Sequence, residues 1–190
     1  MNSLAPRPTL RTPRLVLRPF DLSDAADVQR LAGDRAIADT TLNIPHPYED
    51  GLAEAWIETH AREYAEGRLV NFAITLSLDG ALIGSIGLKL DGEASGGGEL
   101  GYWVGVPWWN RGYCTEAAAA VLDYGFRVLE LDRIHAHHLL RNPASGRVME
   151  KIGMRAEGVA REALHKEGER EDIALYGILR RYWLRSTPPG

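Results

Sequence analysis

The sequence has a single cysteine, no long apolar run and no excess of positive charge. Cys114 has no second cysteine with which to form an internal disulfide, which is typical of a reducing compartment. No apolar run approaches the roughly 20 residues that span a bilayer, and the N-terminus has no apolar signal core. The net charge of −4 is unlike that of most nucleic-acid-binding proteins. We therefore expect a cytoplasmic protein with no membrane and no nucleic-acid partner.

What remains is the composition of an ordinary globular domain. The 190 residues are 45% hydrophobic and 25% charged, and a chain of this size buries a core without disulfides. We expect one domain over residues 9–185, a flexible N-terminal tail over 1–8 and a C-terminal tail over 186–190. The two ends are rich in arginine, which we attribute to solvated charge on edge elements.

Hydrophobic periodicity predicts a mixed α/β order. Strands are expected over residues 10–20, 69–76, 81–90, 100–106, 133–140, 154–164 and 172–179. Helices are expected over residues 25–31, 49–67, 142–152 and from about Thr115 to Leu129. Residues 40–48 contain Pro45 and Pro47 and must form a loop, which either faces the substrate or simply connects two helices.

The stretch over residues 98–126 carries the clearest chemical signal. Its strand pattern stops at Pro107, a short loop carries Gly112, and an apolar helix face follows. The first turn of a helix leaves N–H groups unpaired, and the helix dipole places partial positive charge there. The pattern predicts a bound phosphate or pyrophosphate just before Thr115, with a plain connection as the alternative. The loop has neither a Walker nor a three-glycine dinucleotide pattern.

Four motifs then occur in a recognisable order: TLRTPRLVLRPFDLSDA, PHPYEDGLAEAWI, WWNRGYCTEA and LLRNPASGRVMEKIGM. Together they resemble the GNAT superfamily of acyl-CoA-dependent N-acetyltransferases over about residues 9–180. They are most similar to the RimJ/RimL-like branch, which includes ribosomal-protein alanine N-acetyltransferases. The resemblance implies a mixed, mostly antiparallel sheet of six to seven strands, flanked by helices and splayed at the central strand.

The resemblance also implies acetyl-CoA as co-substrate. The family's pyrophosphate signature, Gln/Arg-x-x-Gly-x-Gly/Ala, falls on residues 109–114, where Trp109 and Cys114 replace its first and last residues. Backbone N–H groups do the binding in such loops, so these replacements matter little. A bulge is expected in the strand that ends at Val106, with its backbone pairing with the pantetheine. The residues expected to bind the co-substrate are Trp103, Val104, Val106, Arg111, Gly112, Tyr113, Cys114, Thr115, Asn142 and Ser145.

Two residues are candidates for the chemistry. Asn142 and Ser145 match the family's Asn-x-x-Ser, which implies that Asn142 contacts the pantetheine and that Ser145 helps the thiolate depart. The alternative is that both only cap a helix. Glu99 is the candidate general base, because the amine must be neutral to attack; the alternative is a surface carboxylate at a strand end.

The remaining reactive side chains, three histidines and one cysteine, give weaker indications of function. His135, His137 and His138 lack a third and fourth ligand at a fixed spacing, so we expect no metal. His138 could assist as a base, and no activating partner marks Cys114 as a nucleophile.

The expected function is direct acetyl transfer from acetyl-CoA to a primary amine, with a protein N-terminus as one candidate acceptor. The alternatives are a small-molecule amine, such as an antibiotic or a polyamine, and a non-catalytic acyl-CoA-binding regulator. The oligomer is expected to be a monomer or a homodimer.

Overall fold

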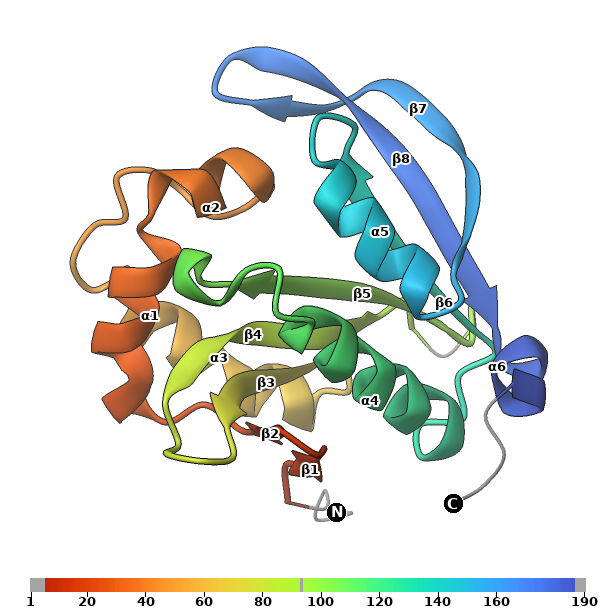
Figure 1. The fold of residues 1–190 in the computed structure, drawn as a ribbon, viewed down its shortest axis with the longest axis horizontal. Coiled ribbons are helices and arrows are strands. Elements are labelled where there is room, and N and C mark those ends of the chain that lie inside the picture. Colours follow the sequence, from red (N-terminus) through yellow and green to blue (C-terminus); the bar gives the residue numbers. More distant parts are fainter. Residues whose placement is uncertain (1–5, 93, 187–190) are drawn as a thin grey trace.

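The computed structural model describes residues 6–92 and 94–186. These residues form one eight-stranded sheet in the order β1-β2-β3-β4-β5-β6-β8-β7 (Figure 1). The strands are β1 (Leu10–Arg11), β2 (Leu15–Arg18), β3 (Leu69–Leu76), β4 (Leu82–Leu90), β5 (Gly97–Val104), β6 (Arg133–Leu139), β7 (Arg155–Lys166) and β8 (Glu169–Leu179). The helices are α1 (Ala25–Ala32), α2 (Arg35–Thr40), α3 (Leu52–Ala65), α4 (Tyr113–Arg127), α5 (Pro143–Lys151) and α6 (Arg180–Ser186). Most of the two expected tails lies outside the described residues.

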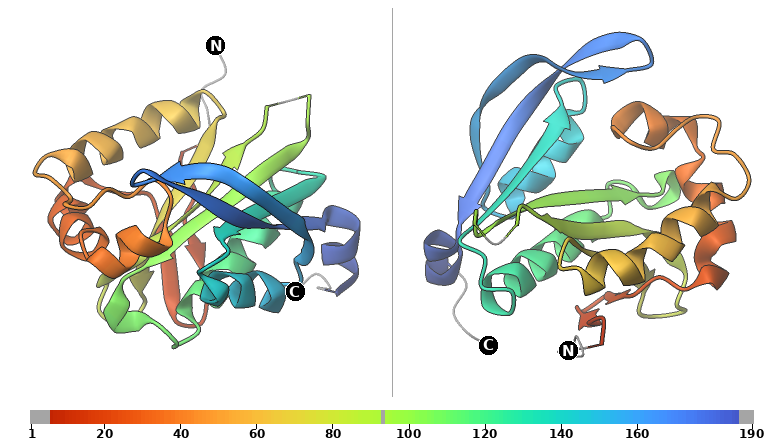
Figure 2. Two further views of the ribbon diagram at one scale, coloured as in Figure 1. Left: turned by 90° about the horizontal axis from the view of Figure 1, so that it is seen from above. Right: turned by 180° about the vertical axis from the view of Figure 1, so that it is seen from behind.

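Helices cover both faces of the sheet, as the two views of Figure 2 show. One face packs α4 and α5 against the larger core, in which Phe72 and Ile86 of the sheet meet Val121 and Leu122 of α4. On the other face, Ala73 packs into a smaller core with residues of α1 and α3. The alternation predicted for the strands follows from this arrangement, because successive side chains of a strand enter opposite cores.

The sheet separates between β5 and β6. These two strands are parallel and pair only over Gly97–Glu99 with Arg133–His135, whereas every other neighbouring pair is antiparallel. From Leu100 to Val104, β5 pairs with β4 and has no pairing with β6. The expected splay at the central strand is confirmed, and it leaves one edge of β5 available inside the molecule.

The expected details of this strand need two corrections. β5 keeps a single register with β4 from Gly98 to Val104, so the expected bulge is wrong, and the splay comes from β6 turning away. The strand ends at Val104, because Val106 begins a short 3-10 turn, Val106–Trp108, that contains Pro107. A proline has no N–H to continue the ladder.

The single strand expected over residues 10–20 is instead the hairpin of β1 and β2, which raises the strand count to eight. Pro13 lies in its turn, and the hydroxyl of Thr12 accepts the N–H of Leu15 at 3.0 Å. Two short helices, α2 and α6, were not expected. The helix α2 has only six residues and is capped by Asp34, which accepts the N–H of Ala36 at 2.8 Å.

Candidate active site

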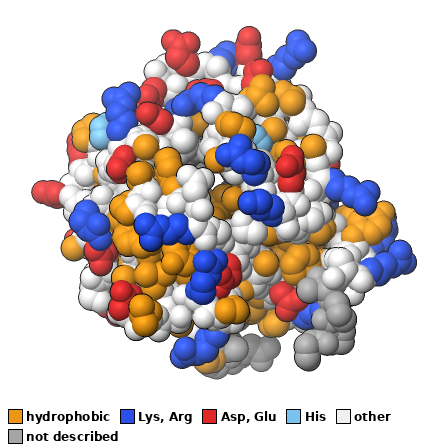
Figure 3. Space-filling model, in the orientation of Figure 1, with side chains coloured by type: hydrophobic (Ala, Val, Ile, Leu, Met, Phe, Trp, Pro, Cys, Tyr) orange, Lys and Arg blue, Asp and Glu red, His pale blue; other side chains and the backbone are white. Residues whose placement is uncertain are grey.

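A cavity of about 1150 Å³ lies where β5 and β6 separate. Its walls come from β5, the end of β6, the first turn of α4, one face of α5, α3 and residues 40–45. Figure 3 shows a hollow near the middle of the face formed by α4 and α5, with Lys and Arg side chains beside it. Of the residues expected at the site, all but Val106 and Arg111 line this cavity. The loop over residues 40–48 also lines it, through residues 40–45 and Tyr48, which favours the substrate-facing alternative.

The N-terminus of α4 forms one end of the cavity. Gly112 is the N-cap residue, and its φ of 78° lies in the left-handed region that glycine adopts without strain. Because no side chain caps this helix, its first N–H groups are available to a ligand. This arrangement fits a pyrophosphate at the place where the sequence predicts one.

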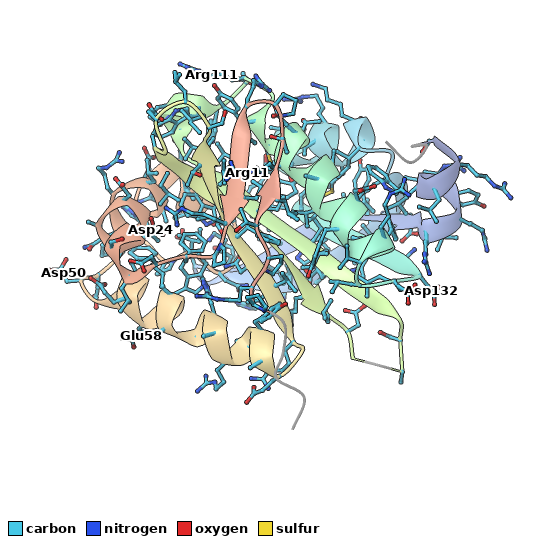
Figure 4. The ribbon with its side chains drawn as sticks, turned by 90° about the horizontal axis from the view of Figure 1, so that it is seen from below. Arg11, Asp24, Asp50, Glu58, Arg111 and Asp132 are labelled. Atoms are coloured by element: carbon cyan, nitrogen blue, oxygen red, sulfur yellow. The ribbon has the colours of Figure 1, made fainter. Side chains whose placement is uncertain are left out.

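The loop before α4 is braced from the β1–β2 hairpin. Arg14 donates from Nη1 to the carbonyl of Arg111 at 3.0 Å and from Nε to Glu116 at 2.6 Å. Its guanidinium also lies 4.6 Å from the ring centroid of Tyr113. Figure 4 shows Arg111 at the outer edge of the molecule, and its carbonyl is the group that Arg14 binds. Sequence reasoning missed Arg14, because no local pattern links residues that are 97 positions apart.

Ser145 meets Tyr102 inside the cavity. The two hydroxyl oxygens lie 2.8 Å apart, and the Tyr102 hydroxyl lies 3.1 Å from the carbonyl of Ser145. Burial raises the pKa of Tyr102, so the phenol stays protonated and remains a donor. The strand pattern alone did not identify Tyr102 as part of the site.

Asn142 has two hydrogen-bonding roles. Its Oδ1 accepts the N–H of Ser145 at 3.4 Å, so Asn142 caps α5. Its Nδ2 donates to the carbonyl of Thr40 at 3.1 Å, and the neighbouring Arg141 donates to the carbonyl of Asp39 at 2.6 Å. The connection between β6 and α5 is therefore tied to the end of α2. A contact between Asn142 and pantetheine stays a prediction.

Glu99 lies against a histidine. Its Oε1 is 3.0 Å from Nδ1 of His137, and both side chains line the cavity. The hydrogen bond from His137 holds the pKa of Glu99 below its ordinary value, with burial opposing and the charge of His137 reinforcing the effect. Lys89 is the direct cross-strand partner of Glu99. His138, the histidine named from sequence as a possible base, is buried, and its Nδ1 lies 2.8 Å from the carbonyl of Leu139.

Most of the charged residues that line the cavity are cationic. Among the described residues that line it, Glu99 is the one carboxylate, while Lys89, Arg147 and Lys151 are cationic. Arg147 and Lys151 are exposed and lie four residues apart on α5, so they share a face of that helix. Aromatic side chains also line the cavity, among them Tyr48, Trp56 and Trp103.

The structure gives no sign of an activated thiol, since burial raises the pKa of Cys114 to about 12. Within residues 6–92 and 94–186, no three His, Cys, Asp or Glu side chains are grouped so that they could hold a metal ion. Nor does this part of the chain contain a helix that is both long and apolar enough to cross a membrane.

Comparison with known proteins places the chain in a family. Residues 14–155 match the model of the acetyltransferase (GNAT) domain. The uncharacterized N-acetyltransferase YnaD of Bacillus subtilis (strain 168) is 34% identical over 175 residues, which cover 92% of this chain and 98% of YnaD. The [ribosomal protein uS5]-alanine N-acetyltransferase of Escherichia coli (strain K12) is 31% identical over 84 residues, 44% of this chain and 43% of that enzyme.

Among solved structures, Mycobacterium smegmatis RimJ in complex with CoA-disulfide superposes with a TM-score of 0.80 at 25% identity, covering 94% of this chain and 92% of RimJ. The family match spans most of the chain, and the sheet separates at β5 as the resemblance to this family implied. The chain therefore belongs to the GNAT family of N-acetyltransferases, in the branch that contains RimJ and the ribosomal-protein alanine N-acetyltransferases.

Proposed function

We propose that this enzyme transfers the acetyl group of acetyl-CoA directly to a single primary amine, with a protein N-terminus as the favoured acceptor. One observation carries the proposal: the cavity joins an uncapped helix N-terminus at Gly112 to the Glu99–His137 pair, along the free edge of β5. One end therefore suits a phosphate and the other an amine. Similarity to the uS5-alanine N-acetyltransferase supports a protein N-terminus as acceptor.

In this proposal, the pyrophosphate of acetyl-CoA lies on the backbone N–H groups of residues 111–115. The pantetheine follows the unpaired edge of β5 at Trp103 and Val104, as an added strand would. Arg147 and Lys151 offer positive charge to the phosphates from α5. Val106 lies beyond the end of the strand, so its expected contact is the least supported by the fold.

The chemistry that these residues suit is a direct attack. The neutral amine attacks the thioester carbonyl carbon, a C–N bond forms, and a backbone N–H near Val104 stabilises the developing oxyanion. The C–S bond then breaks, and the sulfur leaves as a thiolate that must be protonated. The Ser145 hydroxyl, hydrogen-bonded to Tyr102, is our candidate for the proton donor at this step.

The charge of the cavity bears on the choice of acceptor. A polyamine carries several positive charges, and each needs a carboxylate or similar acceptor when it is desolvated. Glu99 is the one carboxylate among the described lining residues, and Lys89 lies directly across the strand from it. We therefore favour an acceptor with one amine, whose neighbouring apolar groups contact Trp56 and Trp103.

The test is an acceptor screen. The protein is incubated with acetyl-CoA and a panel of peptides with free N-termini, monoamines and polyamines, while thiol release is measured and products are identified by mass spectrometry. Acetylated peptide N-termini would support the proposal. Acetylation of polyamines alone would contradict the proposed acceptor, and binding of acetyl-CoA without acetylation of any amine would favour a regulator.

A further inference from the structure

Strand β6 presents two histidines on one face, and each is paired with a carboxylate. Nε2 of His135 lies 3.0 Å from Asp91, and Nδ1 of His137 lies 3.0 Å from Glu99. The exposed fractions of the side chains are similar, 34% and 33% in the first pair and 27% and 29% in the second. Only the His137–Glu99 pair lines the cavity. The two pairs thus share their chemistry and differ in their access to the candidate site.

The two histidines also use different ring nitrogens. His135 contacts its carboxylate through Nε2, whereas His137 uses Nδ1. A carboxylate that accepts the Nδ1 proton selects the tautomer in which Nε2 carries a lone pair. In His137 the basic nitrogen is therefore the one that Glu99 leaves free.

We propose that His137 accepts the proton of the incoming amine through Nε2 and that Glu99 acts as its positioning residue. This assignment rests on the proposed function and gives His137 and Glu99 separate roles in deprotonating the amine. Glu99 is poorly suited to be the base itself, because its Oε1 is already occupied by His137 and its pKa is held low. An imidazolium that forms at His137 is stabilised by the carboxylate beside it.

The surroundings of the pair are compatible with this step. The charged or titratable groups that influence Glu99 are His137 and His135 on β6 and Lys89 on β4. The segment between α2 and α3 and strand β7 contribute lining side chains without charge at neutral pH, among them Thr41, Asn43 and Leu164. No second carboxylate among the described lining residues competes with Glu99 for the ring.

The proton balance is as follows. The ammonium form of the acceptor gives one proton to Nε2 of His137, which becomes an imidazolium paired with Glu99. The neutral amine attacks the thioester, the C–N bond forms and the C–S bond breaks. The second amine proton is lost as the amide forms, and one proton is taken up by the departing thiolate. His137 returns its own proton to solvent, so the ammonium and the thioester become an amide, a free thiol and one released proton.

The experiment compares pH–rate profiles of kcat at saturating acetyl-CoA and peptide for His137→Gln, Glu99→Gln and the matched control His135→Gln. We expect His137→Gln to lower kcat on the order of a hundredfold and to abolish the fall of kcat at low pH. Glu99→Gln should keep that fall, because His137 retains its basic nitrogen in that variant. His135→Gln should match the unaltered enzyme, and His137→Asn serves as a second variant if His137→Gln fails to fold.

The opposite result would reverse the roles. If Glu99→Gln abolishes the fall at low pH while His137→Gln retains it, Glu99 is the base and the inference is wrong. Calorimetry with acetyl-CoA separates this failure from a failure of the proposed function. If the enzyme acetylates peptides and every variant binds acetyl-CoA, the pH–rate profiles test the role of His137 alone. If the protein acetylates no amine, both the proposed function and the role of His137 are contradicted.

Discussion

At the scale of single residues, the site depends on contacts between side chains that lie far apart in the sequence. Tyr102 reaches Ser145 across 43 positions, and the hydroxyl pair is 2.8 Å apart. Arg14 similarly braces the loop before α4 from the β1–β2 hairpin. Ser145 and the loop before α4 each belong to a short sequence motif. The residues that hold them, Tyr102 and Arg14, come from other elements of the fold.

The Tyr102–Ser145 pair leads to the first prediction. Tyr102→Phe removes the hydroxyl that holds Ser145 Oγ, a bond worth about 1 kcal/mol. We expect kcat to fall about fivefold to tenfold while the affinity for acetyl-CoA is kept. Steady-state kinetics and calorimetry measure the two quantities. Tyr124→Phe is the matched control, since Tyr124 is also a largely buried tyrosine but does not line the cavity; equal kinetics for both variants would contradict a role for Tyr102.

Sequence reasoning at this scale succeeded where a motif is continuous. Gly112, Asn142 and Ser145 each lie in a short pattern, and all three line the cavity. It missed Tyr102, His137 and Arg14 as members of the site, because their partners are set by the packing of separate elements. His137 in particular is placed against Glu99 by the short parallel pairing of β5 with β6, which no spacing within either strand reveals.

At the scale of elements, α2 and the start of α5 form one side of the cavity together. Asn142 caps α5 and holds the carbonyl of Thr40, and Arg141 binds the carbonyl of Asp39 as well as Glu171. The loop after α2 lines the cavity. Its position is therefore tied to the turn between β6 and α5.

Substitutions of Asn142 separate its two bonds. Asn142→Asp keeps an oxygen for the helix cap but loses the donor to Thr40, so stability should stay near that of the unaltered protein while KM for the amine rises about fivefold. Asn142→Ala should lose the cap as well and lower the free energy of unfolding by about 1 kcal/mol. Thermal denaturation and kinetics at saturating acetyl-CoA measure these effects. An unchanged KM in Asn142→Asp would show that the bond to Thr40 does not hold the loop.

The sequence predicted long helices and strands better than short ones. The long periodic segments gave β3, α3 and the apolar face of α4 close to their observed bounds. The six-residue α2 and the seven-residue α6 are too short for a helical period to be read, and the Thr12–Arg14 turn divides one expected strand into two. The register that matters most, β5 against β6, is a non-local pairing.

At the scale of the whole molecule, a buried histidine couples folding to pH. His60 on α3 is only 2% exposed, and its Nε2 lies 3.1 Å from Nδ2 of Asn71, which lines the cavity. Burial, followed by the charge of Arg7, lowers the pKa of His60 to about 4. An unfolded chain has a histidine pKa of about 6.5, so below that value the unfolded state binds a proton that the folded state does not.

Stability should therefore fall as the pH is lowered from about 6.5 to about 4, by up to about 3 kcal/mol from this residue. His60→Phe keeps a ring against Phe20 and Trp56 and removes the titrating group. Urea denaturation at several pH values should show a smaller pH-dependent loss in this variant, while the exposed His165→Gln behaves like the unaltered protein. Equal losses in all three proteins would contradict the assignment to His60.

The central claim is that acetyl-CoA binds with its pyrophosphate at the N-terminus of α4, and calorimetric titration of Gly112→Glu with acetyl-CoA tests it most directly. A carboxylate at this position opposes the phosphates at close range, so we expect Kd to rise at least about a hundredfold. Gly80→Glu is the control, because Gly80 has a similar φ of 76°, open space around it and no place in the cavity. A hundredfold loss in Gly112→Glu alone is the predicted result; an unchanged Kd in both variants would contradict the account.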